Sequence, residues 1–167
     1  EKPWSRVSLT EIAAKAEASL AEARDAFPNR ACLVAAVISR HDRAMLAGAE
    51  DFQEEETRRD RLFETMMRRL EAMRHHKAAL RSMAFGSAFD LPALLAGGAR
   101  LSGSLKWMLR AAGVPAEGPL GLLRTKALAA VYLATLRAFA ADESEDLSDT
   151  MAALDKALKR AGGVISG

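Results

Sequence analysis

Apolar side chains recur along this chain at steps of three and four residues, which is the spacing of one helix face. No segment alternates apolar and polar residues as a half-buried strand does. Ser8 with Glu11, and Ser19 with Glu22, have the spacing of capping boxes, in which a serine and a glutamate bond the free N–H groups at a helix start. The pattern predicts an all-α protein that begins with two short helices.

Proline and asparagine delimit the next helix. Pro28 ends the second short helix near Phe27, because proline lacks the N–H group that would continue the hydrogen-bond ladder. Asn29 then caps a longer helix that runs to about Gly48. The acidic run EDFQEEE, at positions 50–56, comes after this helix and is expected to be a connector. It divides the chain into a first domain, residues 1–48, and a second, residues 49–167.

The second domain is predicted to contain a long amphipathic helix and several buried ones. Apolar residues from Leu62 to Met73 recur at steps of one, three and four, with arginines at positions 58, 59, 61, 68 and 69 on the polar side. Glycines are expected to break the middle into helices at Leu91–Ala96 and Leu101–Ala112. Pro119–Ala141 reads as a helix that is apolar around most of its circumference, and Leu147–Ala161 as a last helix with a narrow apolar seam.

Bulk composition excludes several classes of function. A net charge of +2 gives no general attraction to nucleic acid or to an anionic membrane. No apolar run reaches the roughly 18 residues of a membrane span. The single cysteine, Cys32, excludes an intrachain disulfide and fits a reducing compartment, so a cytoplasmic protein without integral membrane contact is expected.

The sequence shows no catalytic or metal-binding motif and implies no cofactor. His75 and His76 are adjacent, so on a helix they point about 100° apart and are expected to be surface residues rather than metal ligands. Nucleophile-elbow, zinc-protease, Walker and dinucleotide patterns do not occur. We therefore expect a binding protein and not an enzyme.

Methionines concentrate in the second domain, together with tryptophan and tyrosine, in a chain that has few aromatics. Methionine fills irregular space and adapts to varied partners. An ordinary core explains such a cluster, and so does an apolar pocket with a few polar tips. The pocket interpretation assigns an apolar small molecule or lipid to these candidate ligand residues: Met66, Leu70, Met73, Trp107, Met108 and Tyr132.

The first 46 residues resemble the DNA-binding module of the TetR regulators. The resemblance is carried by I-A-x-x-A at Ile12, Ala13 and Ala16, by Ser19 at the turn, and by F-P-N-R from Phe27 to Arg30. WSRVSLTEIA, at positions 4–13, is similar to the segment that comes after the first helix in such proteins, so that helix is expected to be absent from residues 1–167.

The resemblance implies a helix-turn-helix in which the helix after Ser19 is the recognition helix. The residues it places near DNA are Ser19, Leu20, Ala21, Arg24, Asn29 and Arg30. The chain also departs from the family. Glu17 replaces the glycine of the turn, Arg24 replaces a phosphate-contacting tyrosine, and Glu22 stands where a hydroxyl is common. Basic and acidic side chains balance within residues 1–30.

The second domain resembles the ligand-binding and dimerisation domain of the same family. That resemblance implies a homodimer formed through Pro119–Ala141 and Leu147–Ala161, and Leu154→Glu is expected to give monomers. The segments LKWMLRAAG and RTKALAAVYLATL are also similar to the lipid-binding accessory proteins of ubiquinone biosynthesis, a TetR-fold branch.

Two functions follow from these resemblances. The first is a TetR-type transcriptional regulator, expected to be a repressor. Its affinity for DNA is changed by an apolar ligand in the second domain. The alternative is a lipid-binding accessory protein of ubiquinone biosynthesis that keeps the fold and no longer reads DNA. The balanced charge of residues 1–30 favours the alternative, because a DNA-reading surface is usually basic.

Overall fold

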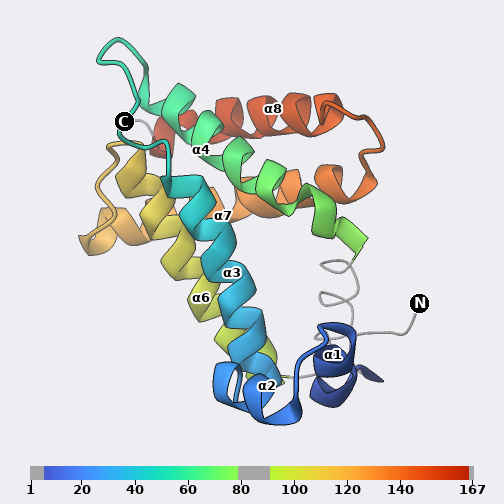
Figure 1. Ribbon diagram of the computed structural model, residues 1–167. Helices are drawn as coiled ribbons and strands as arrows, with labels where there is room; N and C mark the ends of the chain where they lie inside the picture. The colour runs from blue at the N-terminus through green and yellow to red at the C-terminus, as the bar shows by residue number, and fades with distance from the viewer. Residues whose placement is uncertain (1–5, 79–90, 166–167) are drawn as a thin grey trace.

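The structure is a computed structural model that describes residues 6–78 and 91–165, with residues 91–97 described by their backbone alone. All regular structure in these residues is helical, as the sequence pattern predicts (Figure 1). The elements are α1 (Leu9–Lys15), α2 (Leu20–Ala26), α3 (Arg30–Leu46), α4 (Arg58–Met73), the short 3-10 helix η2 (Arg74–His76), α6 (Leu91–Ala111), α7 (Gly118–Ala141) and α8 (Ser148–Ile165).

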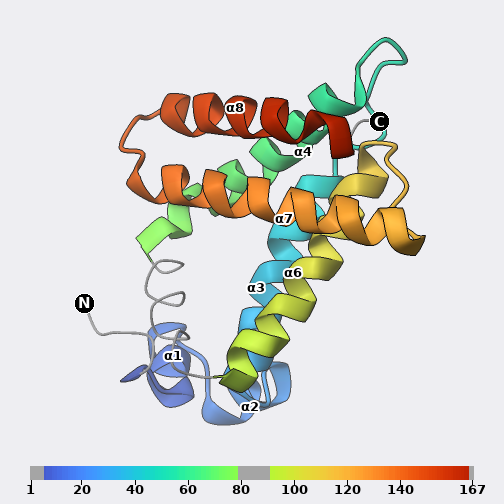
Figure 2. The same cartoon turned by 180° about the vertical axis from the view of Figure 1, so that it is seen from behind.

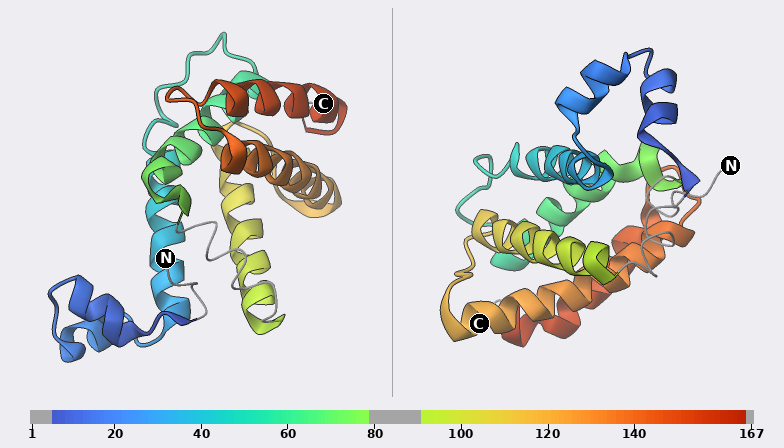
Figure 3. Two further views of the ribbon diagram at one scale, coloured as in Figure 1. Left: turned by 90° about the vertical axis from the view of Figure 1, so that its right-hand side faces the viewer. Right: turned by 90° about the horizontal axis from the view of Figure 1, so that it is seen from below.

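Helices α3 and α6 stand side by side and connect two ends of the molecule (Figure 1 and Figure 3, left). Helices α1 and α2 lie at the N-terminal end of α3. Helices α4, α7 and α8 lie at its other end, where α7 and α8 run beside each other in opposite directions (Figure 2). The view along the helices from below shows α1 and α2 set apart from α7 and α8 (Figure 3, right). Helix α3 is therefore the element that joins the two ends.

The first three helices begin at the residues that the capping pattern predicts. Ser8 accepts a hydrogen bond from the Glu11 amide, and the Glu11 carboxylate accepts one from the Ser8 amide, which completes the capping box of α1. Ser19 and Glu22 make the same pair of bonds at the start of α2. The side chain of Asn29 accepts from the Cys32 amide and caps α3.

One predicted break in the middle of the chain is wrong. The glycines at positions 97, 98 and 103 do not separate two helices, because α6 is continuous from Leu91 to Ala111. Glycine in a helix interior costs only about 1 kcal/mol relative to alanine. Burial of Leu105, Met108 and Leu109 along this helix supplies apolar contacts that offset such a cost.

The core lies where α4, α6, α7 and α8 meet, and methionine and leucine dominate it. The apolar seam of α8 belongs to this core, since Leu154 and Leu158 are almost fully buried within one chain. A charge at Leu154 would therefore disrupt folding before it affected association, and Leu154→Glu is expected to unfold the chain rather than to give folded monomers. Helix α8 also extends four residues beyond Ala161, to Ile165, whose side chain is buried.

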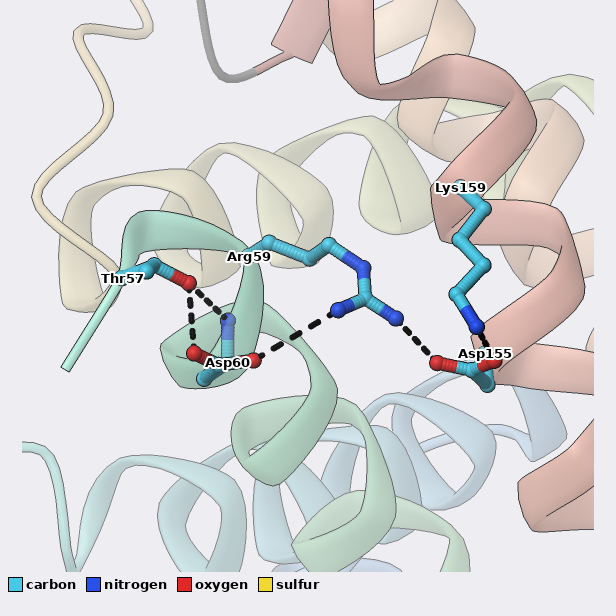
Figure 4. A network of polar contacts seen from close by, with 5 residues as sticks. All are labelled: Thr57, Arg59, Asp60, Asp155 and Lys159. Atoms are coloured by element: carbon cyan, nitrogen blue, oxygen red, sulfur yellow. Dashed lines mark hydrogen bonds and ion pairs between the residues drawn. The ribbon is translucent and has the colours of Figure 1, made fainter.

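An ion-pair network fixes the N-terminal turn of α4 against α8 (Figure 4). Thr57 caps α4 by accepting a hydrogen bond from the Asp60 amide, and its hydroxyl donates to the Asp60 carboxylate at 2.6 Å. Arg59 pairs with Asp155 of α8, which also pairs with Lys159 at 2.8 Å. These side chains are partly exposed, so the network orients the two helices more than it stabilises them.

A buried aspartate that lies before α8 in the chain caps that helix. One carboxylate oxygen of Asp142 accepts hydrogen bonds from the Thr150 amide at 2.8 Å and from the Thr150 hydroxyl at 2.6 Å. The other oxygen accepts from the Ser144 amide. Burial by itself raises the pKa of the Asp142 carboxyl, but these bonds outweigh burial and hold its pKa well below the usual value. The carboxylate therefore stays ionised and satisfies the free donors at the start of α8.

Replacing Asp142 with alanine leaves the Thr150 and Ser144 donors without their acceptor. We expect Asp142→Ala to lower the free energy of unfolding by about 1–3 kcal/mol, measured by urea denaturation. Glu143→Ala, which changes the exposed neighbour, serves as the control and should unfold like the unmodified chain. Equal midpoints for the two variants would show that the cap contributes nothing measurable.

Candidate functional site

One face of α2 is exposed and carries three of the residues that the sequence assigns to DNA contact. At about 100° per residue, Leu20, Ala21 and Arg24 share this face. The Arg24 side chain is 83% exposed, and its ion pair with Asp25 is long at 3.8 Å. Leu20 is also exposed, at 59%. The face is thus available to contact another molecule.

The other three predicted contact residues lie at the two ends of α2. Ser19 is exposed and caps α2, and Asn29 is exposed and caps α3. Arg30 is the first residue of α3 and is half-buried. The structure therefore brings the six predicted residues to one end of the molecule, although two of them already have structural roles as helix caps.

Two glutamates shape the electrostatics of the turn and of the start of α2. Glu17 has φ +55°, the left-handed conformation that the family's glycine would adopt without strain. Hydrogen bonds donated by the Ser19 hydroxyl and amide lower the pKa of the Glu22 carboxyl. Glu22 is therefore ionised, and its charge already neutralises the end of α2 that would otherwise attract a phosphate.

Helices α1, α2 and the start of α3 enclose an apolar hollow of about 290 Å³. It is lined by Leu9, Ile12, Ala13, Ala16, Ala18, Glu22, Ala23, Ala26, Phe27 and Leu33. A second hollow, of about 460 Å³ and with more polar walls, lies between the acidic connector and α4, where Phe52 contacts the guanidinium groups of Arg61 and Arg68. None of the candidate ligand residues lines either hollow.

Five of the six candidate ligand residues are buried in the core. These are Met66, Leu70, Met73, Met108 and Tyr132. Trp107 is separate from them, because its side chain is 52% exposed and stacks on the Arg110 guanidinium at 4.9 Å. Trp107 and Met108 are consecutive on α6 and so point to different sides of the helix. The structure brings the five together and leaves Trp107 on the surface.

A polar cluster that includes Tyr132 joins four helices; its arginine is buried and its aspartate is half-buried, at 23% exposed. Arg69 of α4 is 4% exposed, pairs with the Asp42 carboxylate of α3, and donates through Nε to the Tyr132 hydroxyl of α7 at 3.0 Å. Ser104 of α6 donates to the other Asp42 oxygen at 2.7 Å. The Tyr132 hydroxyl in turn lies 3.8 Å from the sulfur of Met73. We refer to Asp42, Arg69, Ser104 and Tyr132 as the Asp42 cluster.

Sequence reasoning missed most of this cluster. The amphipathic pattern placed Arg69 on the polar side of α4, whereas it is among the most buried residues of that helix. This prediction was wrong because an arginine is expected to be exposed unless a partner for its charge is known, and the partner Asp42 is on another helix. The sequence did carry one signal: position 69 lies three residues after Met66 and four before Met73, which is the spacing of one helix face.

His41, adjacent to Asp42, was also missed by the sequence analysis. Its side chain is 3% exposed, and its Nε2 atom has no hydrogen-bond partner among the described residues. Burial lowers the pKa of His41 below its usual value, and the nearby positive charges of Arg69, His76 and Arg40 lower it further. By contrast, His75 and His76 are exposed, as the sequence predicts.

Comparison with known proteins gives matches only at the level of three-dimensional structure. No protein-family model matches the chain, and no curated protein sequence matches it. The crystal structure of a TetR transcriptional regulator from Nitrosomonas europaea ATCC 19718 is similar, with a TM-score of 0.79 and 26% sequence identity over 96% of this chain and 88% of that one. The chain has a TetR-like fold. A TetR transcriptional regulator from Rhodococcus sp. RHA1 is similar at a TM-score of 0.61 and 20% identity, over 94% of this chain and 87% of that one.

The TetR-like fold gives the described helices an interpretation by position. Helices α1 and α2 correspond to a helix-turn-helix, which agrees with the resemblance of residues 1–46. Both of these similar structures are described as TetR transcriptional regulators. Among the residues that the structure describes, no helix has the length and apolar character needed to cross a membrane.

The low pKa of His41 makes stability depend on pH in a defined direction. Below pH about 6.5 the unfolded chain binds a proton at this histidine before the folded chain does, so stability falls as pH decreases. We expect His41→Gln to reduce the loss of melting temperature between pH 7.5 and pH 5.5. His75→Gln, at an exposed site, should keep the full loss. Identical pH profiles for the two variants would contradict this account of His41.

Proposed function

We propose that the protein is a TetR-type transcriptional regulator that binds DNA as a homodimer and responds to an apolar ligand. In this proposal residues 1–48 read DNA, and residues 49–167 bind the ligand and pair two protomers. The observation that carries it is the exposed face of α2, with Leu20, Ala21 and Arg24, in a chain with a TetR-like fold. A helix of this kind enters the major groove with its N-terminal residues against the bases.

The residues of this face suit a small contact with DNA. Arg24 has an exposed guanidinium that can contact a phosphate or a guanine edge, and Ala21 allows close approach of the backbone. Ser19 and Asn29, exposed at the two helix starts, present further polar groups. Arg30 adds a second cation at the start of α3. Together these residues can contact the DNA backbone and position α2 on it. The balanced charge of residues 1–30 adds no general attraction to DNA.

The exposed side of α7 supports pairing of two protomers. Leu122, Ala130 and Leu133 fall on one face of this helix, opposite the face that Leu128 and Val131 bury in the core. Leu122 and Leu133 are each about half exposed, at 53% and 51%. Lys126 and Arg137 are exposed on the same face. The face therefore combines apolar side chains with two cations, a mixed surface of the kind that subunits can bury when they associate.

The ligand is proposed to lie among the five buried candidate residues, which belong to α4, α6 and α7. Methionine side chains there can repack around a guest, because they are unbranched and rotate freely. Tyr132 offers a hydroxyl as a polar handle, already hydrogen bonded to Arg69. Repressor action would follow if the ligand favours an arrangement of the two α2 helices that does not fit one DNA site. Trp107 remains a candidate only for a contact at the surface.

The alternative function, a lipid-binding accessory protein of ubiquinone biosynthesis, is favoured by one observation. The ionised Glu22 carboxylate occupies the start of α2, where a DNA-binding helix would meet a phosphate. In that case the fold and the apolar interior would serve lipid transport, and the face of α2 would have no nucleic-acid partner. Neither of the two similar structures is described as a protein of this kind.

DNA binding is tested by selecting duplexes from a random-sequence library and titrating the best one at several salt concentrations. We expect saturable, sequence-specific binding that Arg24→Ala weakens. The slope of log affinity against log salt should become shallower by about one, as for loss of a single phosphate contact. Arg160→Ala removes an exposed arginine from α8 and should leave both quantities unchanged. Binding that shows no sequence preference would favour the lipid-binding alternative.

Pairing through α7 is tested with Leu133→Glu, which replaces an exposed apolar side chain of this face with a charged one. We expect the unmodified chain to have the mass of a dimer and the variant that of a monomer, by light scattering after size exclusion. Helix content should be unchanged, because Leu133 points away from the core. Leu20→Glu makes the same change at an exposed leucine of α2 and should remain dimeric. A dimeric Leu133→Glu variant would place the interface elsewhere.

A further inference from the structure

Helix α3 is most deeply buried near its C-terminal end. Its buried side chains are His41 and Met45, both in the last turns, whereas the side chains from Arg30 to Ser39 are exposed or half-buried. The helix carries α1 and α2 at its other end (Figure 1). Contacts near residues 41–45 therefore contribute to the orientation of α1 and α2 relative to α7 and α8.

The Asp42 cluster lies at this point of attachment. Asp42 is bound on both carboxylate oxygens, by Arg69 of α4 and by Ser104 of α6. Arg69 extends the connection to α7 through the Tyr132 hydroxyl, and its guanidinium lies 5.5 Å from the centre of the Tyr132 ring. A single side chain of α3 is thus tied to three other helices by directional bonds.

Directional bonds determine orientation in a way that apolar packing does not. A buried ion pair adds little stability relative to well-packed apolar residues, because desolvation offsets the attraction between the charges. Its hydrogen bonds nevertheless allow only a narrow range of angles, especially at a planar guanidinium. Replacing the pair by apolar side chains of similar size should therefore leave the chain folded while widening the range of orientations open to α3.

We propose that Asp42 and Arg69 are positioning residues that set the angle of α3 and, through it, the placement of the DNA-reading face of α2. This inference rests on the proposed function for its biological meaning. Asp42 lies twelve residues after Arg30. At about 1.5 Å per residue the separation is about 18 Å, so a rotation of about 10° at Asp42 displaces the start of α3 by about 3 Å.

The same contacts give the proposed ligand a route to DNA. Tyr132 and Met73 are candidate ligand residues, and Tyr132 is the hydrogen-bond partner of Arg69. A guest that displaced the Tyr132 hydroxyl would leave the Arg69 Nε donor without its acceptor and shift the guanidinium. Asp42, bound to that guanidinium, transmits the shift to α3. The cluster is thereby a physical connection between the two ends of the molecule.

The inference is tested by measuring the orientation of α3 directly. Spin labels are attached to Cys32, the single cysteine of the chain, and to a second site introduced by Glu143→Cys after α7. Labelled chain is diluted into an excess of unlabelled Cys32→Ser chain, so that distances within one protomer are read whatever the oligomeric state. Distance distributions are compared for the parent chain, for Asp42→Asn, and for the double variant Asp42→Leu with Arg69→Met.

We expect a narrow distribution for the parent chain and a broader or displaced one for both cluster variants, by several ångström. Affinity for the selected DNA should fall by about fivefold or more. The matched control is Asp155→Asn, which breaks another arginine–aspartate pair, between α4 and α8, without touching α3 (Figure 4). It should leave the distribution and the affinity unchanged. Helix content and melting temperature are recorded for every variant.

The double variant keeps the test decisive if Asp42→Asn fails to fold, because it leaves no unpaired charge in the core. An unchanged distance distribution in a folded cluster variant would overturn the inference. A changed distribution in a chain that binds no specific DNA would uphold the positioning role and overturn the proposed function instead. A change of equal size in Asp155→Asn would mean that α3 responds to any loosening of α4, and would also overturn the inference.

Discussion

The burial of one guanidinium constrains the rest of this structure. A charged group that is almost fully removed from water must be paired. Arg69 forms an ion pair with Asp42 of α3 and donates a hydrogen bond to the Tyr132 hydroxyl of α7. Ser104 of α6 completes the arrangement by satisfying the remaining carboxylate oxygen. The apolar core then packs around a polar centre whose geometry is fixed by hydrogen-bond directions rather than by volume alone.

Local structure was largely predictable because it depends on short-range chemistry. Ser8, Ser19 and Asn29 start helices as their spacing predicts, since a cap needs only the residues within one turn. The continuity of α6 was not predictable, because a glycine's small cost is decided by the surface against which the helix packs. Likewise, the pattern could not separate the exposed leucines of α7 from the buried leucines of α8, because the residue type is the same in both.

The candidate site was predictable in the parts that depend on exposure and less so in its interior. Leu20, Ala21 and Arg24 lie together on an exposed helix face because seven residues of helix suffice to place them. The Asp42 cluster joins residues from four helices, with up to 90 positions of the chain between Asp42 and Tyr132. No local pattern encodes such a pairing. The two similar structures place the chain among TetR-like folds, and they do not assign its ligand.

The turn between α1 and α2 has a glutamate in a backbone conformation that glycine adopts without strain. Glu17 holds a left-handed backbone conformation, which costs a side-chain-bearing residue about 1–2 kcal/mol. Glycine would remove that strain. It would also raise the conformational entropy of the denatured chain, which lowers the free energy of unfolding by about 0.5–1 kcal/mol. The two effects oppose each other and leave a small net penalty. Stability alone therefore distinguishes the two residues only weakly at this position, and the Glu17 carboxylate adds negative charge beside α2.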